Sequence, residues 1–172
     1  MLPYLRNEMT HVTRMGQRFT TRSEGVGDVK ASALIKLYQS DDARHRLHAN
    51  LGVSLPTGSI DERDDTPAQN KAKLPYRMQL GSGSVDLMPG VTYTGFGNTF
   101  SWGAQLMLTV PTDYNDNDYR MGNRGQLSGW LARSFTPAFS GSLRLIHSAW
   151  GNIDGARDDL NPMMVPTADP GA

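Results

Sequence analysis

Four histidines, together with many serines, make hydrolysis the first chemistry to test against this sequence. A hydrolase needs a nucleophile and a base within hydrogen-bond reach of each other. His147 and Ser148 are neighbours, so in an extended strand their side chains point to opposite faces. His48 and Ser54 share a parity but would lie about 20 Å apart along a strand. The GSGS string at residues 81–84 lacks the strand-to-helix context of a nucleophile elbow. We therefore expect no enzyme activity and name no catalytic residue.

Metal binding is the second chemistry that the residue types suggest. The NDND run at residues 115–118 resembles a calcium loop, but counting from Asp113 the positions that need Gly and Glu hold Asp118 and Arg124. The nine methionines show no Met-x-x-Met spacing near a histidine. The chain has no cysteine, which excludes a thiolate metal site and a disulfide. We expect no metal and no cofactor.

A third chemistry, the passage of solutes, is suggested by polar side chains that share one parity within apolar stretches. These are Lys30, Lys36, Arg44, Arg46, His48, Asp86, Gln105 and Arg144. Most of them are basic, and charged residues that line a pore bias which ions enter it. We expect this set to line a polar pathway that favours anionic or polar solutes. The alternative is that these charges only keep an interior wet or pair with carboxylates on other strands.

The elements that carry this set alternate strictly between apolar and polar residues. In residues 44–55, RHRLHANLGVSL, every second residue from His45 to Leu55 belongs to the apolar parity. A period of two predicts a β-strand with unlike faces, whereas a helix would place Gly52 in its interior. The other segments of this kind are residues 28–38, 84–94, 99–110 and 139–150, with weaker patterns at 125–134 and 3–12.

The connections between these segments sort by length. Short turns join 28–38 to 44–55, 84–94 to 99–110, and 125–134 to 139–150, whereas residues 13–27, 56–83, 111–124 and 151–172 form long polar stretches. In an up-and-down sheet this order places the short turns at one end and the long loops at the other.

These features together predict a membrane fold. Alternating strands with short turns at one end and long polar loops at the other are typical of a transmembrane β-barrel. Hydrocarbon offers no hydrogen-bond partner, so a sheet that crosses it must close on itself. The sequence thus predicts an all-β, antiparallel meander: a partial barrel of about seven strands of crossing length. We expect residues 1–172 to be one segment of a longer barrel.

Composition and aromatic positions bear on the partners. Basic and acidic residues balance at 17 each, so bulk charge indicates no nucleic-acid partner. Aromatic side chains near the short turns are expected to form a girdle at a lipid–water interface: Tyr38, Phe100, Trp102, Phe135 and Phe139. The expected partners are a lipid bilayer and a small-molecule solute, and the oligomeric state stays open. The alternative is a soluble β-sandwich or barrel binding module, in which the apolar parity faces a core.

Several segments resemble a known family. LGVSLPTGSIDERDDTP, KLPYRMQLGSGSVDLMPGVTY, WGNIDG and LNPMMVPTADP resemble the outer-membrane transporter family named for the meta-pathway of phenol degradation, over about Glu24 to Asp169. The resemblance implies a β-barrel in the Gram-negative outer membrane that passes solutes. The expected function is passive uptake or efflux of small solutes, anionic or aromatic, through a polar lumen. The solute and the direction of transport stay open, and a barrel-borne hydrolase is the remaining alternative.

Overall fold

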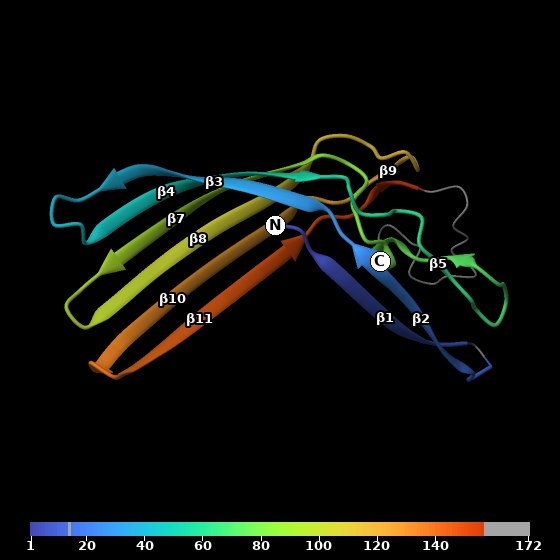
Figure 1. Ribbon diagram of the computed structural model, residues 1–172, viewed down its shortest axis with the longest axis horizontal. Coiled ribbons are helices and arrows are strands. Elements are labelled where there is room, and N and C mark those ends of the chain that lie inside the picture. Colours follow the sequence, from blue (N-terminus) through green and yellow to red (C-terminus); the bar gives the residue numbers. More distant parts are fainter. Residues whose placement is uncertain (14, 157–172) are drawn as a thin grey trace.

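The computed structural model describes residues 1–13 and 15–156, and within them the protein is all-β with antiparallel pairing throughout. Six long strands form one sheet in the order β11-β10-β8-β7-β4-β3 (Figure 1). Their bounds are β3 (Val29–Gln39), β4 (His45–Leu55), β7 (Asp86–Phe96), β8 (Phe100–Pro111), β10 (Arg124–Thr136) and β11 (Phe139–Trp150). None of the described residues forms a helix long and apolar enough to cross a bilayer.

The sorting of connections by length is confirmed. Figure 1 shows the turns β3–β4, β7–β8 and β10–β11 together at one end of the sheet. The long connections and their small elements gather at the other end, which we call the loop end. Those elements are β5 (Arg63–Asp64), β6 (Ala72–Lys73), the 3-10 turn η1 (Tyr76–Met78), β9 (Tyr119–Arg120) and β12 (Asp154–Gly155).

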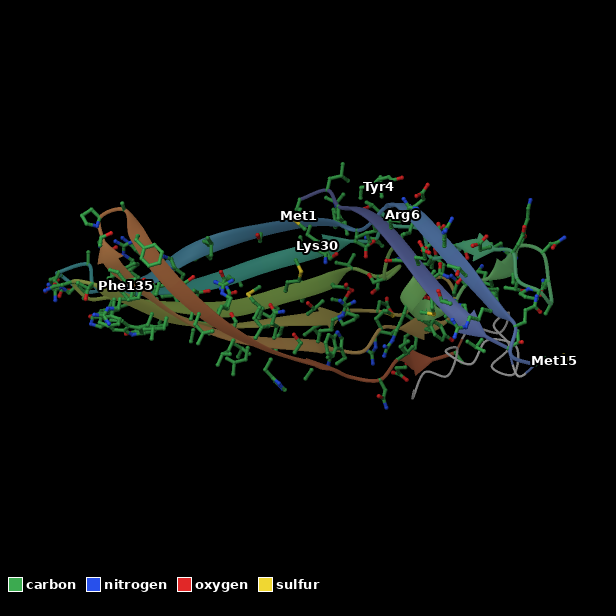
Figure 2. All side chains as sticks on the ribbon, turned by 90° about the horizontal axis from the view of Figure 1, so that it is seen from below. Met1, Tyr4, Arg6, Met15, Lys30 and Phe135 are labelled. Atoms are coloured by element: carbon green, nitrogen blue, oxygen red, sulfur yellow. The ribbon has the colours of Figure 1, made fainter. Side chains whose placement is uncertain are left out.

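The sheet is open, as a partial barrel would be, and one part of the predicted topology is corrected. The described residues form no closed barrel, because the six-stranded sheet ends at β3 on one side and β11 on the other. The correction concerns residues 13–27, which are not a simple loop: Arg18–Val26 forms β2, which pairs with β1 (Tyr4–Val12) in a separate hairpin. This hairpin leaves the sheet near Lys30, and its tip at Met15 lies far from Phe135 at the short-turn end (Figures 1 and 2). The expected set of about seven barrel strands is therefore six strands in an open sheet plus this hairpin.

Strand β2 was missed because polar pairs, rather than an apolar parity, hold it to β1. Arg22 Nε lies 3.4 Å from Glu8 Oε2, across the hairpin. The hydroxyls of Thr10 and Thr20, also opposite each other, are 3.2 Å apart. Cross-strand pairs of this kind stabilise a hairpin without leaving a hydrophobic signature in either strand.

On the six-stranded sheet, leucines of the apolar face are exposed while polar residues of the other face are buried, which is the reverse of a soluble sheet. On the apolar face, Leu51 and Leu127 are 52% and 53% exposed. On the polar face, Asn50, Ser54 and Ser128 are 5%, 1% and 5% exposed. In a soluble sheet the apolar side chains would pack against a core. Here these leucines are exposed, and the three polar residues are the ones that the fold buries.

The alternation breaks at a bulge in β3, and the pairing of β10 with β11 has a second register shift between Ser134 and Thr136. Lys36 pairs with His48, but the next pair is Tyr38 with Leu47, so Leu37 is the extra residue. A bulge of this kind shifts every later side chain to the other face. Tyr38 thereby joins the apolar face, although the simple count places Leu37 there.

The buried apolar residues lie at the loop end rather than between sheets. They are Ala72, Leu74, Tyr76, Met78, Leu80 and Tyr119. The rings of Tyr76 and Tyr119 meet edge to face at 4.6 Å between centroids. The Ser23 hydroxyl of β2 donates to the carbonyl oxygen of Met78 at 2.6 Å, which ties the hairpin to the long β4–β7 connection. The long loops therefore form an ordered cap on one end of the sheet.

Candidate functional site

The polar face carries most of the predicted site residues in cross-sheet rows, because antiparallel partners point to the same side. One row runs Lys36, His48, Thr92, Gln105 and Ser128. The hydroxyl of Thr92 accepts bonds of 2.8 Å from the amide groups of both Gln105 and Asn50. This row is polar across five strands, and Lys36 lies on β3 at the edge of the sheet.

A second row, nearer the short turns, combines cations with aromatic rings. It contains Arg46, Thr94, Gly103, Trp130 and Arg144. The Arg144 guanidinium lies 5.0 Å from the centre of the Trp130 ring. The indole lies over Gly103, where an added Cβ would be 2.2 Å from Trp130 Cζ2. Because Gly103 has no side chain, the Trp130 indole has room to lie over β8.

Arg46 repeats the same arrangement on β4. Its guanidinium lies 5.2 Å from the centre of the Phe96 ring. The polar parity of the sequence marks Arg46 and Arg144 as site residues, but Phe96 and Trp130 are not among the predicted set. Both aromatic residues fall on the polar parity of their strands, and this pattern in the sequence could have predicted that they lie on the polar face.

The remaining predicted residues lie at the two ends of the polar face. Lys30, Ser54 and Asp86 share a row at the loop end. Arg44 lies at the opposite end, in the turn before β4, where its Nη2 donates to Asn98 Oδ1 at 3.1 Å and its Nε is 3.6 Å from Asp42 Oδ2. The predicted set therefore follows the length of the face and does not converge on one point.

Two buried polar atoms of this face have no hydrogen-bond partner within the described part of the chain. They are Arg46 Nε and Ser54 Oγ. A buried donor normally finds a protein or solvent partner, because leaving it unpaired costs free energy. Both atoms are on the side of the sheet that the pathway hypothesis assigns to water and solute.

A cluster that we call the loop clasp joins three connections at the loop end. It consists of Asp28, Gly58, Gly81, Ser82 and Asn115. Asp28 Oδ1 accepts the Gly58 amide at 2.9 Å, and its Oδ2 accepts the Ser82 amide at 2.8 Å. The amide group of Asn115 donates to the Ser82 carbonyl oxygen at 2.9 Å. One buried carboxylate thus holds the β4–β7 connection at both of its ends.

The clasp explains the glycines of LPTGS and LGSGS. A Cβ on Gly81 would lie 2.5 Å from the Gly58 carbonyl oxygen, and one on Gly58 would lie 2.6 Å from that of Leu80. The two backbones pass too closely for any side chain. Gly58 and Gly81 are therefore required by a backbone contact between the two ends of the β4–β7 connection.

The WGNIDG motif forms a second fastening between long loops. Within it, Asp154 pairs with Arg120 in the β9–β12 ladder, and Arg120 Nη2 donates to Asp154 Oδ2 at 2.9 Å. The Tyr114 hydroxyl donates to the same oxygen at 2.7 Å. This hydrogen bond, ahead of the attraction of Arg120, lowers the pKa of Asp154 below its ordinary 3.8. The same bond raises the pKa of Tyr114 above 10.0.

Three of the segments that carry the resemblance lie within the described fold, whereas LNPMMVPTADP lies outside the described residues. The family described as "Putative MetA-pathway of phenol degradation" matches residues 1–157. The chain belongs to this family. The family resemblance is thus confirmed, and the match also covers the β1–β2 hairpin. No curated protein matches the chain.

Two of the histidines of this family member lie on the apolar face of the six-stranded sheet. His45 Nδ1 lies 2.8 Å from the Tyr93 hydroxyl on the apolar face. His147 pairs with Leu127 on that same face, while Ser148 pairs with Gln126 on the other. Among residues 1–13 and 15–156, no three His, Asp or Glu side chains gather closely enough to hold a metal ion.

The aromatic residues expected at the short turns are exposed at that end of the sheet. Trp102, Phe100 and Tyr38 are 36%, 40% and 57% exposed. Phe135 and Phe139 pack on each other with 5.6 Å between ring centroids. All five lie near the short turns of the sheet, and we call them the aromatic band.

Proposed function

We propose that this protein forms the wall of an outer-membrane β-barrel channel that passes small solutes passively along its polar face. The observation that carries the proposal is the reversed burial of the sheet: leucines are exposed on one side while asparagine and serines are sheltered on the other. Lipid is the environment in which an exposed, continuous apolar face is stable. The Gram-negative outer membrane is the corresponding location.

Strand length and loop arrangement support the same proposal. The six strands run from 11 to 13 residues, enough to cross the hydrocarbon at a tilt. Within a bilayer the open edges of β3 and β11 need hydrogen-bond partners. The proposal therefore includes closure of the sheet by further strand pairing at these two edges.

The polar face favours small anions, and among them aromatic ones. Lys36, Arg46 and Arg144 project from it, while Asp86 is the one carboxylate among its described strand residues. A planar anion could pair with a guanidinium while stacking on the ring beside it. The family description names phenol degradation, which agrees with an aromatic solute. The proposal assigns no catalytic step and no cofactor.

The soluble binding module needs the opposite arrangement. A β-sandwich buries its apolar parity against a second sheet. In the described part of the chain, no second sheet covers Leu51, Leu106 or Leu127. We therefore retain the channel as the proposed function.

Insertion into a planar bilayer tests the proposal. The protein, purified in detergent, should insert and produce stepwise currents, with a reversal potential that shows preference for anions in a salt gradient. Cation preference would contradict the solute class while leaving the channel intact. A folded, monodisperse protein in the absence of detergent, without any current, would contradict the channel itself.

A further inference from the structure

One positively charged side chain, Arg133, lies on the otherwise uncharged apolar face of the described six-stranded sheet. Within the described strands of the six-stranded sheet, Arg133 is the only Asp, Glu, Lys or Arg on that face. Its cross-strand partners are Phe100 on β8 and Gly141 on β11. An arginine on a lipid-facing surface is costly unless it reaches the interface and finds an anion there.

Arg133 lies where such an interface would be. It is close to the β10–β11 turn, within the aromatic band of the short-turn end. Its guanidinium lies 5.0 Å from the centre of the Phe100 ring and 5.2 Å from that of Phe135. The two rings pack beside the Arg133 side chain and hold its guanidinium at the short-turn end of the sheet. In the described part of the chain Arg133 has no ion-pair partner.

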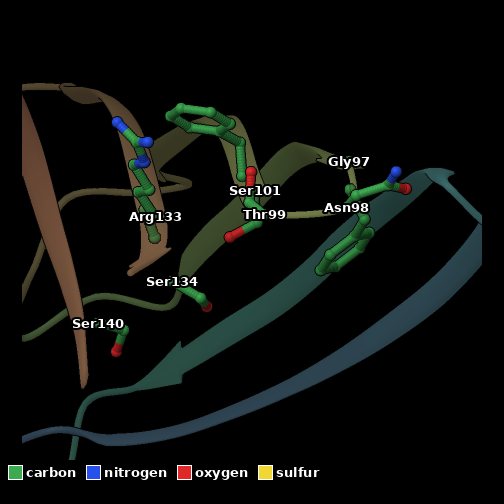
Figure 3. Close-up of a pocket in the computed structure, with 10 residues that line it drawn as sticks. Gly97, Asn98, Thr99, Ser101, Arg133, Ser134 and Ser140 are labelled. Carbon is green, nitrogen blue, oxygen red and sulfur yellow. The ribbon is translucent and has the colours of Figure 1, made fainter. Parts of the chain in front are cut away.

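A pocket of about 360 Å³ adjoins this arginine, between the β7–β8 and β10–β11 turns. Its hydroxyl lining comes from Thr99, Ser101, Ser134 and Ser140. Ser134 pairs with Ser140, one position along from the pair of Arg133 with Gly141, so these two hydroxyls lie on the polar face. In Figure 3 the Arg133 side chain points away from Ser134 and Ser140. The guanidinium therefore lies on the apolar side of this end of the sheet, with the two aromatic rings as its neighbours.

We propose that Arg133 binds the headgroup phosphate of an anionic glycerophospholipid in the leaflet that surrounds the short turns. A guanidinium donates two parallel hydrogen bonds to phosphate oxygens. The acyl chains of the same lipid lie along the exposed leucines below. Short turns of outer-membrane barrels face the periplasm, where the adjoining leaflet contains phospholipid. This inference rests on the proposed membrane function.

Native mass spectrometry of the protein with phosphatidylglycerol tests the site. The wild type should retain bound phosphatidylglycerol in preference to phosphatidylcholine, and Arg133→Gln should weaken that binding about fivefold, the value of one cation near an anionic surface. Arg133→Lys should retain part of the affinity, because lysine keeps the positive charge but lacks the paired N–H donors of the guanidinium. Arg124→Gln is the matched control, because Arg124 lies on the polar face of the same strand, and its binding should be unchanged.

The outcomes separate this site from the channel. Equal phosphatidylglycerol binding by the wild type and Arg133→Gln, in protein that still conducts in bilayers, would overturn the lipid site alone. Displacement of the lipid by millimolar inorganic phosphate, with no difference between headgroups, would show a simple phosphate site and likewise overturn it. Failure of the wild type to enter detergent or bilayers in folded form would overturn both proposals.

Discussion

Gly58 and Gly81 meet backbone to backbone: a Cβ on Gly81 would lie 2.5 Å from the Gly58 carbonyl oxygen. This contact fastens the start of the β4–β7 connection to its end, beside the carboxylate of Asp28. It gives the long loops a fixed shape at the mouth of the proposed channel.

Replacing Gly81 by alanine should therefore loosen the loop clasp. The new methyl group cannot avoid a backbone oxygen, and overpacking of this kind costs about 1–3 kcal/mol. We expect faster proteolysis of residues 56–85 in Gly81→Ala. Gly125→Ala is the matched control, because its Cβ would meet nothing closer than 3.6 Å, and its cleavage rate should match that of the wild type. Equal rates for both variants would contradict the role of the contact.

The hydrogen bonds of the Asp28 carboxylate should contribute most of the polar stabilisation of the loop clasp. Asp28→Ala leaves the buried amides of Gly58 and Ser82 without an acceptor, at a cost of about 1–3 kcal/mol for each donor. Hydrogen exchange at these two amides should accelerate, while exchange in the middle of β8 stays slow. Asp41→Ala, in the exposed β3–β4 turn, serves as the control. Unchanged protection at Gly58 and Ser82 would contradict this account.

Acid and alkali should both loosen the β9–β12 ladder. The folded pKa of Asp154 is lowered, so its contribution to the stability of the ladder is fully present above pH 3.8, its ordinary pKa, and is lost as the pH falls through the folded pKa. The folded pKa of Tyr114 is raised, so its contribution to the same stability is fully present below pH 10.0, its ordinary pKa, and is lost as the pH rises through the folded pKa.

Amide exchange at Tyr119 and Arg120, followed against pH, measures this window. Protection should be highest between the two limits, and Tyr114→Phe should remove the alkaline limb and weaken the acidic one. A pH profile identical in the wild type and Tyr114→Phe would show that the Tyr114–Asp154 bond does not fasten the ladder.

Neighbouring residues of β8 should lose unequal amounts of stability on the same substitution if one face meets lipid. Leu106→Arg places a charge on the exposed apolar face near the middle of the strand and should lower stability in vesicles by about 2–4 kcal/mol. Gln105→Arg places it on the polar face and should cost about 1 kcal/mol, the hydrogen bond to Thr92. Urea unfolding in lipid vesicles gives both values, and a larger cost for Gln105→Arg would reverse the assignment of faces.

The arginines of the polar face should set the charge preference of the current. A unit charge about 4–8 Å from a hydrated ion contributes roughly 0.5–1 kcal/mol in water. Arg46→Gln and Arg144→Gln should therefore each lower the anion-to-cation permeability ratio by about twofold to fivefold. Arg133→Gln removes the same charge from the apolar face and should leave the reversal potential in place. A shift in Arg133→Gln equal to that in Arg46→Gln would show that the current does not follow the polar face.

Sequence alone was sufficient for the strands of the sheet, the sorting of turns and loops, and the family. The parity of a strand is a local property: residues such as Leu47 and Arg46 are assigned to opposite faces by the backbone itself. For the same reason the polar set, from Lys30 to Arg144, could be named before any coordinates. Short turns and long loops are equally visible in a linear chain.

Tertiary structure alone decided which of these residues meet. Register between strands is set across distant parts of the chain, so the row that joins Arg46 to Trp130 and Arg144 is not readable from any one segment. The bulge that moves Tyr38 to the apolar face has the same origin. Strand β2 depends on polar partners in β1, and the clasp depends on Asp28 lying beside two glycines far along the chain. Periodicity reports which side a residue faces, whereas pairing energy between separate segments determines what it faces.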